Sequence, residues 1–149
     1  GEQAQREYVK QPDAVTIVPF DGERLYMVRQ PREATGEQSL LELPAGKLDR
    51  EGEGPEQTAR RELAEEIGKG AREWRALTSF WISPGFSSER MYLYLATDLY
   101  DESAESGEDE RIEVVQVPLE RLDETIEEAH DSKTLVGLLW FRTYVIDRS

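Results

Sequence analysis

Short runs of apolar residues, separated by turn residues, predict a series of β-strands. The first two runs, Ala14–Phe20 and Leu25–Gln30, are rich in β-branched and aromatic side chains. The Asp21-Gly22 pair between them is typical of a two-residue turn, so we expect the two strands to form a β-hairpin. The other expected strands are Leu40–Leu43, Ala76–Ile82, Met91–Thr97 and Ile112–Val117.

Three segments carry the periodicity of helices. The segment Pro55–Ile67 begins with proline, is followed by glycine and has apolar residues four positions apart. Two further helices are expected at Pro118–Ala129 and Lys133–Ile146. The apolar stripe of the first helix consists of Ala59, Leu63 and Ile67. We therefore expect one compact α/β domain over residues 1–149.

Composition narrows the possible functions. The 149 residues are 38% apolar and 34% charged, which is enough apolar material for one core. The net charge of −14 argues against nucleic acid and anionic membranes as partners. Without cysteine the chain has neither disulfides nor thiolate metal ligands. No signal-peptide pattern is present, so a cytoplasmic location is expected.

Three glutamates of the first helix are the clearest chemical feature. Glu62, Glu65 and Glu66 stand at positions i, i+3 and i+4, so their carboxylates share one face. A divalent cation would relieve their mutual repulsion, and hard oxygen ligands suit Mg²⁺ or Mn²⁺. The same spacing is also typical of a solvated charged face with Arg60 and Arg61 as partners. The triplet alone does not decide between the two.

The residues around the triplet resemble the signature of a known family. Leu43-Pro44-Ala45-Gly46-Lys47-Leu48-Asp49 is followed by Glu53 and then by the segment Arg61-Glu62-Leu63-Ala64-Glu65-Glu66-Ile67-Gly68. This pattern resembles the Nudix box of the Nudix hydrolases. It departs from the usual box in two places: the loop from Gly46 to Glu53 is one residue longer, and Lys69 replaces a closing apolar residue.

Three further segments resemble the ADP-ribose pyrophosphatase branch of that family. They are Val28-Arg29-Gln30-Pro31-Arg32, Leu41-Glu42-Leu43-Pro44-Ala45-Gly46 and Ser83-Pro84-Gly85-Phe86. The resemblance implies hydrolysis of the pyrophosphate bond of ADP-ribose, or of a related nucleoside diphosphate sugar, to AMP and ribose 5-phosphate. It also implies an α/β/α sandwich with a mixed β-sheet as the fold, and a divalent cation, Mg²⁺ or Mn²⁺, as cofactor.

The resemblance further assigns expected roles to individual residues. The expected metal ligands are Ala45, through its carbonyl, together with Glu62, Glu65 and Glu66. The expected supporting residues are Gly46, Glu53 and Arg61, the last two as a pair that orients the helix. The expected substrate-binding residues are Arg29, Arg32, Glu42, Pro84 and Phe86. Arginine is included because its forked donors match phosphate oxygens.

A general base is expected in the acidic segment before the last strand. Glu108 matches the catalytic position of the branch best, and Glu110 is its close rival. Glu65 is the next candidate if neither acts. A solvated acidic loop is the alternative for this segment.

Other functions stay open at this stage. Within the enzyme class, the substrate could be GDP-mannose or a dinucleotide polyphosphate; outside it, the chain could be a Nudix domain that senses a ligand without turnover. The branch also implies a homodimer whose second subunit completes the pocket. Residues 1–13 are expected to be a shortened form of the family's N-terminal segment, which argues against the usual exchange between subunits.

Overall fold

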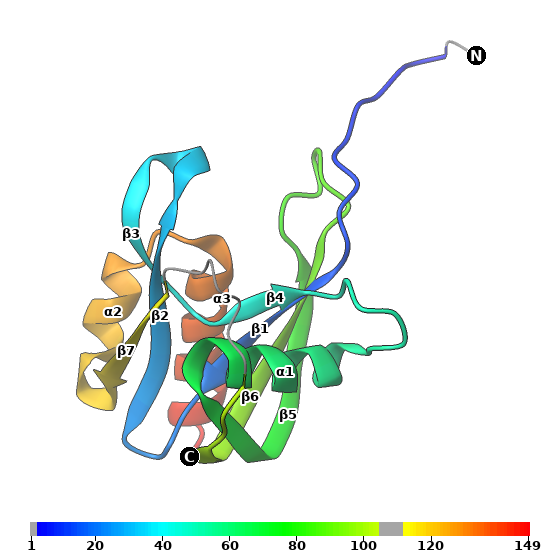
Figure 1. Ribbon diagram of the computed structural model, residues 1–149. Coiled ribbons are helices and arrows are strands. Elements are labelled where there is room, and N and C mark those ends of the chain that lie inside the picture. Colours follow the sequence, from blue (N-terminus) through cyan, green and yellow to red (C-terminus); the bar gives the residue numbers. More distant parts are fainter. Residues whose placement is uncertain (1–2, 105–111) are drawn as a thin grey trace.

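The computed structural model describes residues 3–104 and 112–149, which form one layered α/β unit (Figure 1). The strands are β1 (Ala14–Pro19), β2 (Arg24–Arg32), β3 (Glu37–Glu42), β4 (Ala45–Lys47), β5 (Lys69–Trp81), β6 (Arg90–Asp101) and β7 (Glu113–Pro118). The helices are α1 (Pro55–Ile67), α2 (Leu122–Glu128) and α3 (Ser132–Phe141). Short 3-10 turns occupy Glu33–Thr35 and Leu119–Arg121, and a π-helical turn at Arg142–Ile146 continues α3.

The strands form two sheets rather than one. The first sheet has the order β4-β1-β6-β5, with β1 parallel to β6 and the other pairs antiparallel, so it is mixed. The second sheet is antiparallel and has the order β3-β2-β7. The prediction of a mixed-sheet α/β/α arrangement is confirmed, with the second sheet as an addition.

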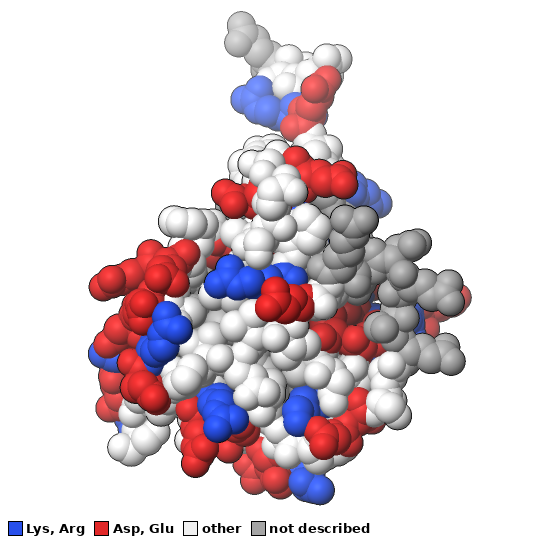
Figure 2. All heavy atoms as spheres, turned by 60° about the vertical axis from the view of Figure 1, so that its left-hand side comes forward, with Lys and Arg blue, Asp and Glu red and all other residues white. Residues whose placement is uncertain are grey.

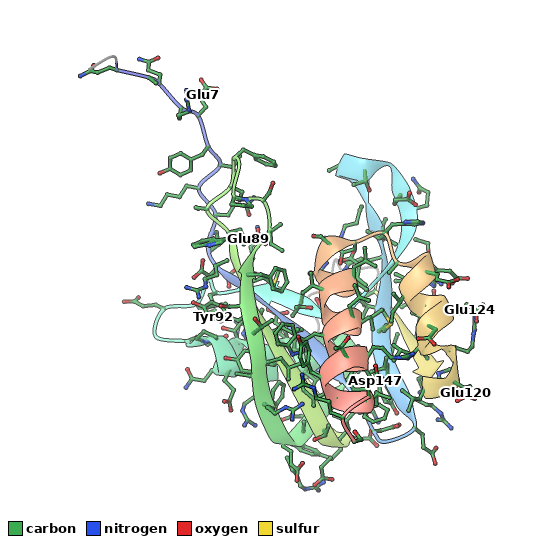
Figure 3. The ribbon with its side chains drawn as sticks, turned by 180° about the vertical axis from the view of Figure 1, so that it is seen from behind. Glu7, Glu89, Tyr92, Glu120, Glu124 and Asp147 are labelled. Carbon is green, nitrogen blue, oxygen red and sulfur yellow. The ribbon has the colours of Figure 1, made fainter. Side chains whose placement is uncertain are left out.

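Strand alternation divides the core into two apolar clusters. Successive side chains of a strand point to opposite faces, so β1 sends Val15 and Ile17 to one cluster and Val18 to the other. The first cluster lies under α1, and the second lies under α2 and α3 on the opposite side (Figures 1 and 3). Every residue of β1 is buried, as expected for a strand that is covered on both faces.

Helix α1 has the bounds and the orientation that the sequence predicts. Its side chains Ala59, Leu63 and Ile67 are buried in the cluster that also contains residues from β1, β2 and β6. Proline occupies its first turn, and Gly68 ends it in a left-handed conformation with φ of 72°. The carboxylate face of α1 is therefore turned away from the core.

The predicted hairpin between the first two strands is wrong. The turn itself forms, because Asp21 Oδ1 accepts the N–H groups of Glu23 (2.9 Å) and Arg24 (2.7 Å). Beyond one bridge between Phe20 and Leu25, however, β1 and β2 separate into different sheets. The reason is competition for backbone partners: β6 pairs with β1 along its whole length, and β3 and β7 take both edges of β2.

Two other strands differ from the prediction. β5 begins at Lys69 rather than Ala76, because an edge strand can leave charged side chains such as Arg72 and Glu73 in solvent. β4 is not among the strands that the sequence pattern predicts. In the structure Ala45 pairs with Thr16 and Lys47 pairs with Ala14, which fixes this segment against β1.

Residues 3–12 extend from the body beside the loop that joins β5 and β6 (Figure 1). Val9 N–H donates to the carbonyl of Phe86 at 2.6 Å, and Val9 forms a bridge with Ser87. Among the described residues, no helix is long and apolar enough to cross a membrane.

Acidic side chains outnumber basic ones on the face shown in Figure 2, in keeping with the net charge of −14.

We expect Leu63→Ala to lower the free energy of unfolding by about 2–5 kcal/mol, because it opens a cavity at a fully buried position of α1. Urea denaturation followed by circular dichroism measures the change. Arg60→Ala on the exposed face of α1 is the control and should cost less than about 1 kcal/mol. An equal loss in both variants would contradict the observed packing of α1.

Candidate active site

A cavity of about 450 Å³ lies where α1, β4 and the start of α3 meet, closed on another side by the ends of the β5–β6 loop. Its lining is strongly charged. The carboxylates are Asp49, Glu62, Glu66, Glu89 and Asp131, and the cations are Arg32, Lys47 and Lys133. Charges of both signs face one hollow, which suits a substrate that is anionic and is accompanied by cations.

One wall of the cavity is built by α1 and β4. Glu62 and Glu66, one helical turn apart, both line it, and Glu66 accepts the backbone N–H of Ala45 at 3.2 Å. The segment before β4 is held against β1, because the Pro44 carbonyl accepts hydrogen bonds from the Ile17 amide (3.0 Å) and the Thr16 hydroxyl (3.2 Å). The register of β1 thus sets how closely Ala45 approaches α1.

Gly46 permits this close approach. A Cβ atom at position 46 would stand 2.0 Å from Cδ of Glu62, well inside van der Waals contact. Any larger residue would push the Glu62 side chain out of its present position. The observed position of the Glu62 carboxylate therefore requires glycine at position 46.

Arg61 connects the acidic residues of α1 to the loop before it. Its Nε donates to Glu53 at 2.9 Å, and its Nη1 donates to Glu62 at 2.6 Å and to Glu65 at 3.0 Å. Burial opposes the charged form, but the hydrogen bonds to Glu53 and Glu62 and the nearby negative charges outweigh it and raise the pKa of Arg61. Arg61 therefore stays charged and holds three carboxylates in place.

The oxygen ligands present suit a hard divalent cation, but they do not yet form a complete carboxylate cage. Glu62 and Glu66 line the cavity, whereas Glu65 is not among the lining residues and pairs instead with Arg50 (3.2 Å) and Arg61. Within residues 3–104 and 112–149, no three acidic or histidine side chains are close enough to hold one ion together. Glu62 and Glu66 are therefore the side chains of the cavity that could contribute carboxylate oxygens to a hard divalent cation.

The opposite wall contains a buried ion-pair network. Arg32 donates from Nε and Nη2 to the two oxygens of Glu42, at 2.7 and 2.8 Å, and Lys133 Nζ donates to the same carboxylate. Lys133 also donates to Asp131 at 2.8 Å. Burial alone would raise the pKa of Glu42, but the hydrogen bonds from Arg32 and Lys133 lower it below the ordinary value. Glu42 is 1% exposed, so it depends on these two partners for its charge.

The other expected substrate-binding residues lie outside the cavity lining. Nη1 of Arg29 donates a hydrogen bond to the carbonyl of Ser39 at 3.3 Å. The next residue along the chain, Gln30, does line the cavity. Pro84 and Phe86 are exposed at the outer end of the β5–β6 loop, where Phe86 is 59% exposed. Glu42 lies behind Arg32 and Lys133. The expected bases Glu108 and Glu110 fall outside the described residues.

Several cavity residues were missed from the sequence. Lys47 and Asp49 belong to the loop between Gly46 and Glu53, for which the sequence predicts no role, and Glu89 belongs to no motif. Lys133 offers one usable signal: it lies in the first turn of a helix, where the helix dipole disfavours a cation unless carboxylates are close. Asp131, the residue that caps α3 by accepting the Thr134 N–H at 3.1 Å, is such a carboxylate.

Comparisons with known proteins identify the family to which the chain belongs. The family model of the NUDIX domain matches residues 10–137, and the chain therefore belongs to the Nudix family. It is similar to the ADP-ribose pyrophosphatase of Bacillus subtilis (strain 168), with 40% identity over 95% of this chain and 78% of the relative. It is also similar to the methanol dehydrogenase activator of Bacillus methanolicus, with 37% identity over the same shares. A crystal structure of an ADP compounds hydrolase superimposes with a TM-score of 0.83 at 30% identity, over 92% of this chain and 74% of that one.

We expect Gly46→Ala to fold but to lose divalent-cation affinity, because its Cβ would displace the Glu62 carboxylate. The flexible end of a glutamate can move at little cost, so the thermal midpoint should change by only a few degrees. Isothermal titration with Mn²⁺ measures the affinity. Gly54→Ala is the matched control, since its Cβ would meet only Gln57 Oε1 at 3.9 Å. Unchanged Mn²⁺ affinity in Gly46→Ala would show that the position of the Glu62 carboxylate does not matter for metal binding.

Proposed function

We propose that this chain hydrolyses the pyrophosphate bond of ADP-ribose, or of a related nucleoside diphosphate sugar, to AMP and ribose 5-phosphate. The observation that carries the proposal is the cavity itself, in which Glu62 and Glu66 face Arg32 and Lys133. The relative named ADP-ribose pyrophosphatase and the structure named ADP compounds hydrolase support the choice of substrate class.

The proposed chemistry divides between the two walls. Glu62 and Glu66, with the carbonyl of Ala45, would hold Mg²⁺ or Mn²⁺; when bound, such cations neutralise phosphate charge and acidify a water molecule. Arg32 would orient the phosphate from the opposite wall. Water oxygen forms a bond to one phosphorus, the bond from that phosphorus to the bridging oxygen breaks, and a carboxylate accepts the proton of the water. Arg61 and Glu53 keep α1 in position and do not touch the substrate.

The open alternatives differ in substrate and in turnover. A panel of ADP-ribose, GDP-mannose and a diadenosine polyphosphate, incubated with and without Mg²⁺ and analysed for products, separates them. Turnover of ADP-ribose above the others supports the proposal. Preference for another compound would make that compound the substrate and would leave the chain a hydrolase of nucleoside diphosphate derivatives. Binding without any product would instead indicate a ligand-sensing domain.

We expect Glu66→Gln to reduce turnover by orders of magnitude while the fold is retained, because the substitution keeps the size of the side chain and removes the charge that a hard cation needs. Initial rates at limiting Mg²⁺ measure the loss. Glu56→Gln, an exposed position on the same helix, is the control and should stay within about twofold of wild type. Turnover close to wild type in Glu66→Gln would remove this residue from the metal site.

Glu108 is our proposed general base, with Glu110 as the rival. General-base assistance is worth about 10²–10⁴-fold, so Glu108→Gln should lower kcat by that factor and leave metal affinity nearly intact. Glu110→Gln should have the smaller effect, and the reverse order would exchange the two roles. If the double variant slows turnover by less than about tenfold, the base lies elsewhere, with Glu65 as the first candidate.

We also propose that the active form is a homodimer. In support, Tyr8, Val9 and Phe86 form an exposed apolar group where residues 3–12 meet the β5–β6 loop, and such surfaces often contact a partner. Sedimentation velocity at assay concentrations should show the dimer. Phe86→Ser should shift the distribution toward monomer. A wild-type chain that is monomeric and fully active would contradict the proposal.

A further inference from the structure

Lys133 is the cavity residue whose position is hardest to explain by folding alone. It stands in the first turn of α3, where the helix dipole disfavours a cation, and its side chain is only 10% exposed. Burying an ammonium group is costly unless carboxylates compensate its charge. Two carboxylates from different parts of the chain, Glu42 and Asp131, do so.

The contacts of Lys133 converge on Arg32 through Glu42. Glu42 is nearly inaccessible and is shared between Lys133 and the fork of Arg32, whose Nε and Nη2 both point to it. This leaves Nη1 of Arg32 outside the pair, on a side chain that is 44% exposed and lines the cavity. The bidentate contact fixes the plane of the guanidinium, and hence the direction in which Nη1 can donate.

The charge of Lys133 also decides how many carboxylates Arg32 must compensate. With Lys133 present, the two carboxylates Glu42 and Asp131 are matched by two cations; without it, Arg32 alone would face both. Asp131 cannot turn away easily, because it caps α3 through the amide and the hydroxyl (2.6 Å) of Thr134. Arg32 would then be drawn between two carboxylates and would lose the single orientation that its bidentate contact with Glu42 fixes.

The same network reaches the metal-binding side of the cavity. The Thr134 hydroxyl that donates to Asp131 also accepts the N–H of Leu43 at 2.9 Å, just before Pro44 and Ala45. Hydrogen bonds therefore connect the start of α3 both to the Glu42 carboxylate that binds Arg32 and to the segment that approaches α1. A change at this point can alter substrate binding without touching the carboxylates of α1.

We propose that Lys133 is a positioning residue for substrate binding: by sharing Glu42 with Arg32, it holds the arginine in the orientation that receives a phosphate group. This inference rests on the proposed function and adds a residue to it. Lys133 acts through Arg32 and makes no contact with the substrate.

The test is a double-substitution cycle on ADP-ribose hydrolysis with saturating Mg²⁺. Lys133→Met should raise KM about tenfold, because Arg32 would no longer be held in the orientation that receives a phosphate group, and should change kcat less than about threefold. In an Arg32→Met background the same substitution should leave KM unchanged, because the group through which Lys133 acts is gone. Lys133→Arg should restore most of the loss. Binding of the α,β-methylene analogue of ADP-ribose, followed by calorimetry, should weaken in the same pattern.

Two controls keep the result interpretable. Lys10→Met removes the same charge at an exposed site and should leave KM within about twofold of wild type. If Lys133→Met fails to fold, Lys133→Gln retains hydrogen-bond donors beside Glu42 and should carry the same cycle with a smaller rise in KM.

Three outcomes would overturn the inference: an unchanged KM in Lys133→Met, a fall in kcat alone, or an equal rise in KM with and without Arg32. The last would mean that Lys133 contacts the substrate directly. A wild-type chain that hydrolyses no compound of the panel would overturn the proposed function and this inference with it. Wild-type turnover with an unaffected Lys133→Met variant would overturn only the inference.

Discussion

The orientation of α1 is the constraint on which the rest of the site depends. Its apolar stripe is buried against strands of both sheets, so the helix cannot rotate about its axis without exposing Leu63 or Ile67. With that face fixed, Glu62 and Glu66 can only point toward the cavity and β4. Packing energy thus maintains a group of like charges that would repel one another on an isolated helix.

Ion pairs compensate the charges of the carboxylates that the fold buries or half-buries at this site. Arg61 gathers Glu53, Glu62 and Glu65 on one side, while Arg32 and Lys133 share the buried Glu42 on the other. Each buried carboxylate requires a partner, since an unpaired buried charge is strongly destabilising. The result is a cavity that carries fixed charges of both signs although the whole chain has a net charge of −14.

The residue pattern of a segment predicts those parts of the fold that depend on interactions within that segment. The bounds of α1 follow from its proline, its terminal glycine and its four-residue apolar spacing. The pairing of β1 could not be predicted in this way, because a turn signal at Asp21-Gly22 says nothing of the stronger competition from β6. β4 was missed for the same reason: its three residues form a strand only because β1 offers a free edge.

The site shows the same division. Glu62, Glu66 and Ala45 stand in one contiguous motif, and the structure brings them together. Lys133 and Glu42 are separated by 91 positions and meet only in the folded chain, in which α3 packs against β1 and β6, so no spacing in the sequence relates them. Arg29 and Arg32 are indistinguishable by residue type, yet only Arg32 lines the cavity.

The central claim is that Glu62 and Glu66 together hold a divalent cation in the cavity. Electron paramagnetic resonance of Mn²⁺, titrated into wild type and into the Glu62→Gln/Glu66→Gln variant, tests it most directly. The wild-type chain should bind Mn²⁺, and the variant should lose that binding while keeping its thermal midpoint within a few degrees. Equal Mn²⁺ binding in two folded proteins would contradict the claim.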